Sequence, residues 1–143
     1  MKRSVLLAFF ALSVMGLGLP GSSLADGDPA AGKALFDANC SSCHGISGKG
    51  DGPVGAALTP APRDFTIGAF AFDADQNGSP GDDQDLMLVI QNGAMKYGGS
   101  PLMAPWPTFT EIQITDMVAH IRSMKTDEAE ETEVESLDPP TAS

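Results

Sequence analysis

Five consecutive residues, Cys40-Ser41-Ser42-Cys43-His44, constrain this chain more than any other stretch. They form the pattern C-x-x-C-H, in which two thiols three positions apart can add to the two vinyl groups of one porphyrin. The histidine that follows at once can offer an imidazole nitrogen to the iron as its proximal ligand. The pattern therefore predicts one covalently attached haem c, held by Cys40 and Cys43 and ligated by His44.

Two other kinds of site also begin with a cysteine pair. A redox dithiol stands at the start of a helix that follows a strand, and no strand-like run precedes Cys40. A structural zinc site needs a second pair of ligands, and the other histidine, His120, is isolated far downstream. The chain has two cysteines, so no disulfide remains once both carry the haem.

Residues 1–25 have the pattern of a secretory signal peptide. Lys2 and Arg3 form its charged start, an apolar run covers residues 5–19, and a small-x-small cleavage site ends at Ala25. The run is shorter than the roughly 20 apolar residues that a spanning helix needs, although an uncleaved N-terminal anchor is the alternative. We therefore expect cleavage, no membrane anchor afterwards, and a periplasmic protein, because bacteria attach haem covalently outside the cytoplasmic membrane.

The mature chain would be small and strongly acidic. Cleavage leaves 118 of the 143 residues, enough for one small domain over residues 26–126. The tail over residues 127–143 begins with seven acids in twelve positions, so we expect it to be disordered. The formal net charge is −11, and loss of two cations with the signal peptide takes it to −13. This charge excludes nucleic acid and anionic lipid as partners and predicts redox partners that present a basic patch.

Helical patterns occur in three stretches, each opened by a capping residue: residues 29–39 after Asp28, 83–92 after Asp82 or Asp83, and 111–124 after Thr110. The glycine inside the first stretch, Gly32, costs a helix roughly 1 kcal/mol relative to alanine, so it indicates a close helix crossing. The segments between are rich in glycine and proline and are expected to be loops. No alternating strand pattern is long enough to predict a sheet.

Three loop residues are candidates for contacts around the haem. Pro53 follows His44 by nine positions, and its carbonyl could accept the Nδ1–H of His44, which would fix the tautomer; a plain turn proline is the alternative. Arg63 could pair with a haem propionate, and a solvated surface arginine is the alternative. Trp106, the one tryptophan, is a second candidate for a propionate contact.

The second axial face of the iron needs its own ligand. Met103 lies in an irregular loop with prolines at 101, 105 and 107, which hold the thioether in place at little ordering cost. Methionines on predicted helices are more often core filling. Met103 is therefore preferred, with Met95, His120 or an open site as alternatives. His/Met ligation leaves no position for oxygen or peroxide and raises the reduction potential, which favours outer-sphere electron transfer.

Residues 73–78 read D-x-D-x-N-G, the first half of an EF-hand-like calcium loop with Asp73, Asp75 and Asn77 as ligands. The twelfth position is Gln84, where a bidentate glutamate is wanted, and no helical pattern enters the loop. Asp82, Asp83 or Asp85 could supply the missing carboxylate. A Ca²⁺ site and an Asx-rich surface turn both remain open.

Taken together, these residues resemble the class I c-type cytochromes, most closely the small bacterial periplasmic members. The resemblance rests on the haem motif, residues 48–53, residues 85–93, residues 100–103 and the first and last predicted helices, and it extends to about residue 125. It implies an all-α cytochrome c fold of three to four helices around one haem, with long irregular loops. It also implies that the first and last helices cross at Gly32, that Pro53 accepts from His44 and that Met103 binds iron. An aromatic residue is usual where this chain has His120, which is expected to be packed and neutral.

The expected function is that of a soluble, monomeric, periplasmic single-electron carrier of a respiratory chain, without enzymatic activity. One alternative is a dedicated cytochrome subunit of a larger dehydrogenase or oxidase. Another is a haem peroxidase or ligand-binding protein with a dissociable Met103, for which His120 is the available acid–base group.

Overall fold

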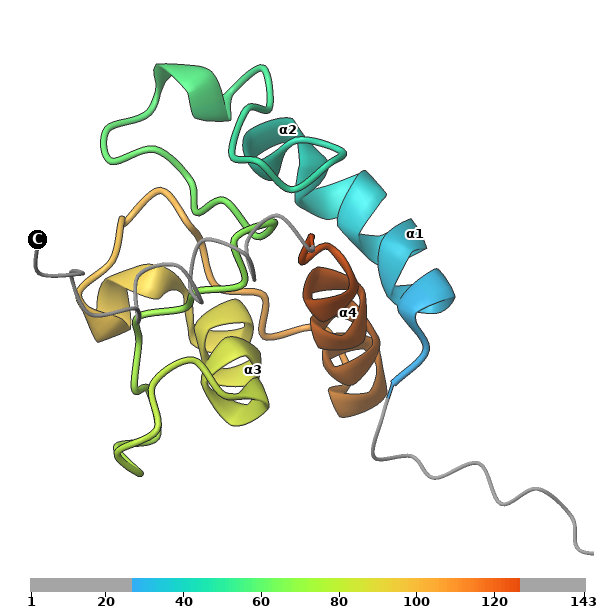
Figure 1. Ribbon diagram of the computed structural model, residues 1–143. Helices are drawn as coiled ribbons and strands as arrows, with labels where there is room; N and C mark the ends of the chain where they lie inside the picture. Colours follow the sequence, from blue (N-terminus) through green and yellow to red (C-terminus); the bar gives the residue numbers. More distant parts are fainter. Residues whose placement is uncertain (1–26, 127–143) are drawn as a thin grey trace, which may run out of the picture.

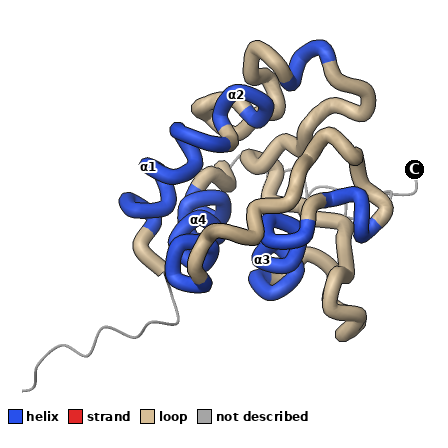
Figure 2. Tube along the Cα trace, turned by 180° about the vertical axis from the view of Figure 1, so that it is seen from behind, coloured by secondary structure: helices blue, strands red, loops and turns tan. Residues whose placement is uncertain are grey.

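The computed structural model describes residues 27–126, which form helices joined by long loops and contain no strand (Figure 1; Figure 2). The elements in chain order are α1 (Pro29–Asn39), α2 (Ser41–His44), the 3₁₀-helix η1 (Gly55–Ala57), α3 (Asp83–Asn92), the 3₁₀-helix η2 (Ala94–Tyr97) and α4 (Glu111–Ser123). The predicted signal peptide, residues 1–25, and the predicted acidic tail, residues 127–143, lie outside the described residues. Within residues 27–126, none of the helices has the length and apolar character that crossing a bilayer requires.

Each long helix begins at a side-chain cap. The carboxylate of Asp28 accepts hydrogen bonds from the first turn of α1, where Pro29 needs none. Asp82, rather than Asp83, caps α3 and forms a capping box with Asp85. Thr110 and Gln113 form the predicted capping box of α4. Because a cap contributes about 1 kcal/mol, these residues fix where the helices start, as predicted from the sequence.

The helices α1 and α4 cross in close contact at Gly32, as the sequence predicted. A Cβ atom on Gly32 would overlap the backbone carbonyl of Asp116 in α4, so only glycine allows this approach. Beside the crossing, the backbone N–H of Asp28 donates to the Asp116 carboxylate (2.7 Å). Phe36 of α1 is buried against the apolar face of α4, which places the first and last helices side by side.

The helix α4 lies between α1 and α3 and forms the centre of the core (Figure 1). The core holds eight buried apolar residues: Phe36, Phe65, Leu86, Ile90, Ile114, Met117, Val118 and Ile121. Arg122 links α4 to the start of α3, since its Nε donates to Asp83 (2.8 Å) and its terminal nitrogen to the carbonyl of Gly81 (2.6 Å). The three long helices therefore pack together through α4, and long loops make up most of the rest of the described chain (Figure 2).

Three short elements were not expected: the turn α2 and the 3₁₀-helices η1 and η2. The single turn α2 forms because the N–H groups of Cys43 and His44 donate to the carbonyl of Cys40 (3.1 and 2.9 Å). Residues 94–97, which we expected to be loop, form the 3₁₀-helix η2. Elements of four residues are too short to show an apolar periodicity, so the sequence pattern cannot reveal them.

Candidate haem site

A cavity of about 660 Å³ lies between α2, α3 and the loops around residues 58–72 and 98–106. This volume falls in the range of roughly 300–1,000 Å³ that is usual for cofactor and small-molecule sites. The walls are largely apolar. The sulfur- and nitrogen-bearing side chains among the lining residues are Asn39, Cys40, Cys43, His44, Arg63, Met103 and Trp106.

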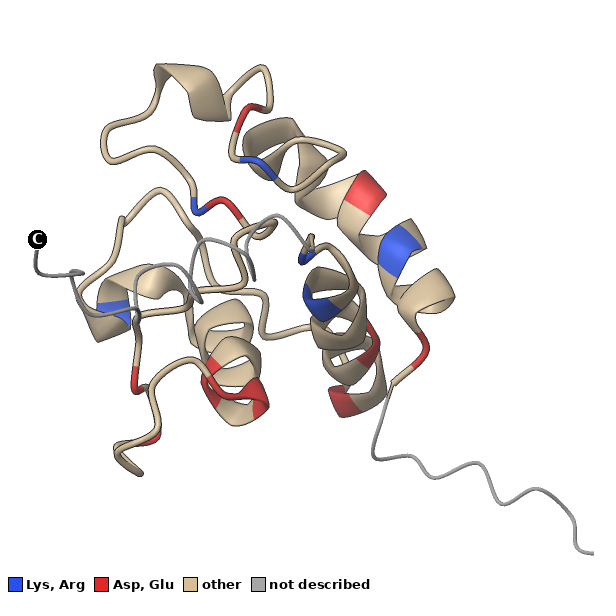
Figure 3. Ribbon diagram, viewed as in Figure 1, with Lys and Arg blue, Asp and Glu red and all other residues tan. Residues whose placement is uncertain are grey.

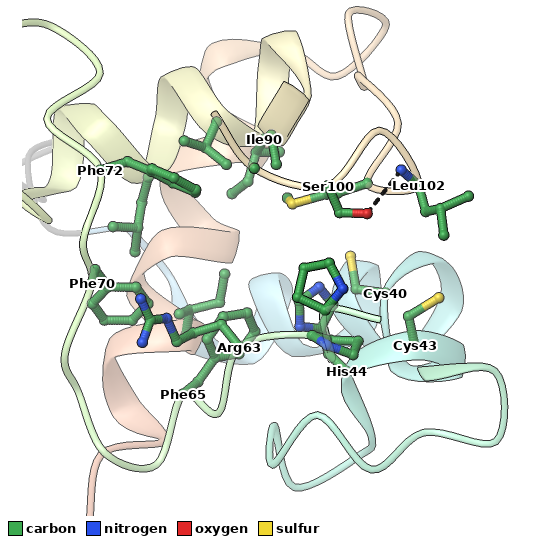
Figure 4. Close-up of a pocket in the computed structure, with 18 of the residues that line it drawn as sticks. Cys40, Cys43, His44, Arg63, Phe65, Phe70, Phe72, Ile90, Ser100 and Leu102 are labelled. Carbon is green, nitrogen blue, oxygen red and sulfur yellow. Dashed lines mark hydrogen bonds between the residues drawn. The ribbon is translucent and has the colours of Figure 1, made fainter. Parts of the chain in front are cut away.

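The two cysteines reach the cavity from one turn of helix. Figure 4 shows the sulfur atoms of Cys40 and Cys43 on the same side of α2, pointing into the space below the loop that carries Ser100 and Leu102. The hydrogen bond from Leu102 N to Ser100 Oγ (3.2 Å) helps to fix that loop. The spacing of three residues, set on one turn, therefore places both thiols on the wall of the same cavity.

Burial raises the pKa of the Cys40 thiol to about 11, and the neighbouring Cys43 acts in the same direction. A redox-active dithiol needs a lowered thiol pKa, because the thiolate is the nucleophile. The cluster of acidic, histidine or cysteine side chains that the described residues bring within metal-binding reach consists of Asp73, Asp75 and Asp85 and does not include the cysteines. The geometry therefore gives no support to the dithiol and zinc alternatives.

The imidazole of His44 is held in an apolar setting. Burial lowers its pKa, and the backbone of Arg63 acts in the opposite direction. Its Nδ1 atom is buried without a hydrogen-bond partner. A neutral imidazole is the form that binds a metal, so this environment keeps His44 in the state that a haem iron requires.

The predicted hydrogen bond from His44 to Pro53 is wrong for this structure. Pro53 is exposed and does not line the cavity, and Nδ1 of His44 has no partner. The reason lies in the path of the loop, because Val54 N donates to the carbonyl of Ser42 (2.9 Å) and holds this segment against the backbone of α2. Residues 62–65 return to the cavity instead, and Phe65 stacks on the ring of His44.

Met103 lies on the cavity wall and packs against the core, whereas the alternatives for the sixth ligand lie elsewhere. Met95 is 67% exposed and does not line the cavity. His120 is buried at the crossing of α1 and α4, against Phe36, and does not line it either. The structure therefore brings His44 and Met103 to one cavity from distant parts of the chain, while axial ligation by Met103 stays a prediction.

The two candidates for propionate contacts both line the cavity. Arg63 is exposed, which places its guanidinium at the mouth. Trp106 is half-buried and stacks on Phe109, with ring centroids 5.2 Å apart. Its backbone N–H donates to the carbonyl of Ile90 (3.1 Å), which fixes this loop to the end of α3. Their positions are consistent with contacts to a bound group, and the contacts themselves stay predictions.

The acidic loop differs from the predicted ligand set. Asp73 and Asp75 come together with Asp85, while Asn77 donates to the carboxylates of Asp75 (3.0 Å) and Asp82 (2.7 Å). These hydrogen bonds are those of an Asx-rich turn, which was the alternative to a calcium loop for this stretch of sequence. Calcium binding stays a prediction, and the melting temperature measured with and without Ca²⁺ is its test.

Asp85 is one of the three residues that the sequence offered as the missing carboxylate of the acidic loop, and it is the one that the structure brings beside Asp73 and Asp75. It is 1% exposed, and its carboxylate accepts from the backbone N–H groups of Ala74 (2.5 Å), Asp75 (3.2 Å), Gly81 (2.7 Å) and Asp82 (3.2 Å). Asp85 thereby holds the acidic loop against the start of α3, beside the cavity that it also lines. The sequence contained one signal for this role, the capping box with Asp82, because a carboxylate or amide three positions after the cap reaches back to the backbone N–H of the cap.

The residues present fit a covalently attached haem. The cavity offers two thiols three positions apart, an imidazole whose pKa is lowered by burial, and a thioether from a separate loop. Thiol, imidazole and thioether are the groups that attach and ligate c-type haem. The guanidinium of Arg63 adds a cation to the lining of the cavity, where it could pair with the propionates of such a cofactor.

Known proteins are similar to this chain over most of its described length. Residues 29–125 match the family described as Cytochrome c. Cytochrome c-554(547) of Halothiobacillus neapolitanus is 35% identical over 102 residues, which cover 69% of this chain and 99% of that protein. Among solved structures, a chain of the reducing HAO-like protein complex of Kuenenia stuttgartiensis superimposes with a TM-score of 0.55 and 31% identity. The match covers 79% of this chain and 46% of that chain, so this chain spans about half of its length.

Proposed function

This chain belongs to the cytochrome c family and transfers electrons through covalently bound haem c, and on that premise we propose that it is a soluble, monomeric, periplasmic single-electron carrier. One observation carries the proposal: Cys40, Cys43, His44 and Met103 line a single apolar cavity. The signal-peptide pattern of residues 1–25 supports export, and the charge of −11 supports solubility and steering by an electric field.

The proposed roles follow from the chemistry of each side chain. The thiols of Cys40 and Cys43 would form the thioether links to the haem, and His44 and Met103 would supply the nitrogen and sulfur that bind its iron. When bound, the haem supplies an iron that alternates between ferric and ferrous. The apolar walls exclude water, and axial ligation by Met103 raises the reduction potential. The guanidinium of Arg63 and the indole of Trp106 would meet the propionates at the edge of the cavity.

The proposed docking face lies around Cys43, where the cavity wall approaches the surface. Large apolar side chains are exposed near it along the chain: Ile46 is 73% exposed and Val54 is 51% exposed. Acidic side chains lie over much of the described chain (Figure 3), among them those at the starts of α3 and α4 and Asp51 in the loop beside α2. We propose that the overall negative field attracts a partner with a basic patch, and that apolar contact around Cys43 then completes docking.

The ligand assignment is tested by replacing Met103 with alanine in the mature holoprotein. We expect an absorption-monitored redox titration of the wild type to show a low-spin haem with the weak far-red band of Met–iron ligation. Met103→Ala should lose that band, and its reduction potential should fall, because a soft thioether ligand favours the ferrous iron.

Met95→Ala is the matched control, since Met95 is exposed and does not line the cavity. It should leave the spectrum and the potential unchanged. A Met103→Ala protein that kept the band would refute the assignment, and a colourless protein from a haem-competent host would refute the whole proposal.

A dedicated subunit of a larger redox complex is a second candidate. The observation that favours it is the solved chain described above, which is part of a reducing HAO-like protein complex and resembles this chain over 46% of its own length. Gel filtration of the native periplasmic extract, monitored by haem absorbance, separates the two. Elution at the size of the single chain supports the free carrier, and elution at a larger size supports the subunit.

An enzymatic role has less support from the positions of the side chains. A peroxidase needs an acid–base group beside the open face of the iron. His120, the available candidate, lies at the crossing of α1 and α4 and does not line the cavity. We therefore propose a function without catalysis, for which slow binding of carbon monoxide to the native ferrous protein is the expected result.

A further inference from the structure

The imidazole of His44 lies almost flat against the ring of Phe65, with the ring centroids 4.6 Å apart and the planes at 17°. We propose that Phe65 is a positioning residue, whose aromatic face sets the rotational orientation of the His44 ring and hence the orientation of the axial ligand plane over the haem. This inference rests on the proposed ligation of iron by His44. No motif in the sequence pointed to Phe65, which follows two prolines in a loop without regular structure.

Phe65 can act as a fixed surface because it is itself held on several sides. Its side chain is 7% exposed, and its backbone N–H donates to the carbonyl of Gly48 (2.8 Å). The ring of Phe36 meets it edge-on at 6.2 Å, and the ring of Phe70 stacks on it at 5.9 Å. Because aromatic pairs of this kind contribute about 0.5–1.5 kcal/mol each beyond their buried area, Phe65 has little freedom to follow a turning imidazole.

The ring of His44 has few other constraints. A metal-bound histidine is ordinarily fixed by a hydrogen bond from its second nitrogen. Nδ1 of His44 makes no hydrogen bond of ordinary geometry, and the backbone of Arg63 is close enough only to raise the pKa of the ring against the effect of burial. Phe36 is the other aromatic neighbour, but its centroid is 6.3 Å away and its plane is tilted by 51°. Rotation of the imidazole about its Cβ–Cγ bond would push a ring edge into the face of Phe65, so the stacked face is the contact that selects one orientation.

The orientation of an axial imidazole can be measured. In low-spin ferric haem, the imidazole plane sets the in-plane magnetic axes, which determine the g-values and the order and spread of the haem methyl resonances. A residue that only fills space near the iron would not change these quantities when its volume is kept. The spectroscopic signature therefore separates positioning from packing.

The test compares Phe65→Leu with Phe65→Tyr in ferric holoprotein, using electron paramagnetic resonance and proton NMR. Leucine keeps apolar bulk but lacks a flat face, so we expect shifted or doubled g-values and a changed order of the haem methyl resonances. Tyrosine keeps the face and should restore the wild-type pattern. Phe109→Leu is the control, because Phe109 packs on the core, stacks on Trp106 and makes no ring contact with His44. A wild-type pattern in Phe65→Leu would overturn the inference.

A measurement on the wild type alone keeps the inference testable if Phe65→Leu yields no holoprotein. In the diamagnetic ferrous state, we expect nuclear Overhauser contacts between the ring protons of His44 and Phe65, and their absence would overturn the inference. Failure of the proposed function looks different. A high-spin ferric spectrum or a colourless wild type would refute the ligation or the haem itself, whereas failure of this inference leaves a normal low-spin protein.

Discussion

His120 is the second histidine of the chain. It lies outside the cavity, and the fold lowers its pKa. It is 8% exposed, and its ring meets that of Phe36 edge-on with a centroid distance of 5.3 Å. Burial lowers the pKa of His120, the positive charge of Lys33 lowers it further, and the negative charge of Asp37 acts in the opposite direction. The folded protein therefore holds the neutral imidazole that we expected at this position.

The lowered pKa of His120 predicts acid sensitivity. Since the pKa of the folded state lies below the ordinary value of 6.5, the unfolded state binds the proton more readily. The contribution of the neutral ring to stability is complete above pH 6.5 and is lost as the pH falls towards the lowered pKa. We expect the free energy of unfolding of the holoprotein to fall over this range, with urea titrations at a series of pH values as the measurement.

The control for this prediction is His120→Phe, which keeps a ring against Phe36 but has no titratable nitrogen. It should remove most of the pH dependence that appears as the pH falls below 6.5. If His44 binds the iron as proposed, His120 is the histidine left to titrate there. Equal pH dependence in both proteins would show that His120 is not the group responsible.

At the scale of the elements, the crossing of α1 and α4 is the contact on which the helix arrangement depends. Gly32 is buried, and the carbonyl of Asp116 occupies the space where a Cβ atom would lie. Backbone cannot move aside as a flexible side chain can, so any larger residue must push the two helices apart.

We expect Gly32→Ala to destabilise the holoprotein by about 1–3 kcal/mol, even though alanine is the better helix former by roughly 1 kcal/mol. Urea unfolding monitored by circular dichroism is the measurement. Ala34→Leu is the matched control, because Ala34 lies on the exposed side of α1, and it should change stability by less than about 0.5 kcal/mol. An unchanged or higher stability in Gly32→Ala would contradict the close crossing.

The elements also show why prediction from the sequence has limits. The starts of α1, α3 and α4 were predicted because capping residues act within one turn of their own helix. The turn α2 and the 3₁₀-helix η2 were missed because they depend on a few backbone hydrogen bonds and on the surrounding loops. The Pro53 carbonyl failed as the acceptor for His44 for the same reason, since the path of its loop depends on contacts with α2.

At the scale of the whole molecule, acidic side chains outnumber basic ones. Some of them lie at the starts of α3 and α4, where the helix dipole favours them (Figure 3). The side chains that would hold the haem line an apolar cavity. A net charge of −11 on a chain of this size produces a field that acts over about a Debye length, which is roughly 10 Å at 0.1 M salt.

The field predicts a salt-dependent rate of electron transfer. With a basic redox protein as partner, we expect the second-order rate constant to fall by about tenfold or more between low and high ionic strength, because screening removes electrostatic steering. Stopped-flow kinetics of haem oxidation is the measurement. A neutral small-molecule oxidant is the control and should react at a rate that salt barely changes. A salt-independent rate with the basic partner would contradict steering.

The sequence alone determined the cofactor chemistry, the capped helix starts and the close crossing at Gly32. Each of these depends on residues within a few positions of one another, or on a close approach of two helices that only glycine tolerates. The tertiary structure decided what depends on distant segments: that Met103 rather than Met95 lines the cavity with His44, that Phe65 rather than a Pro53 carbonyl contacts the imidazole, and that Asp85 holds the acidic loop. Such contacts arise when loops far apart in the chain pack against the same core, and no local pattern encodes where those loops meet.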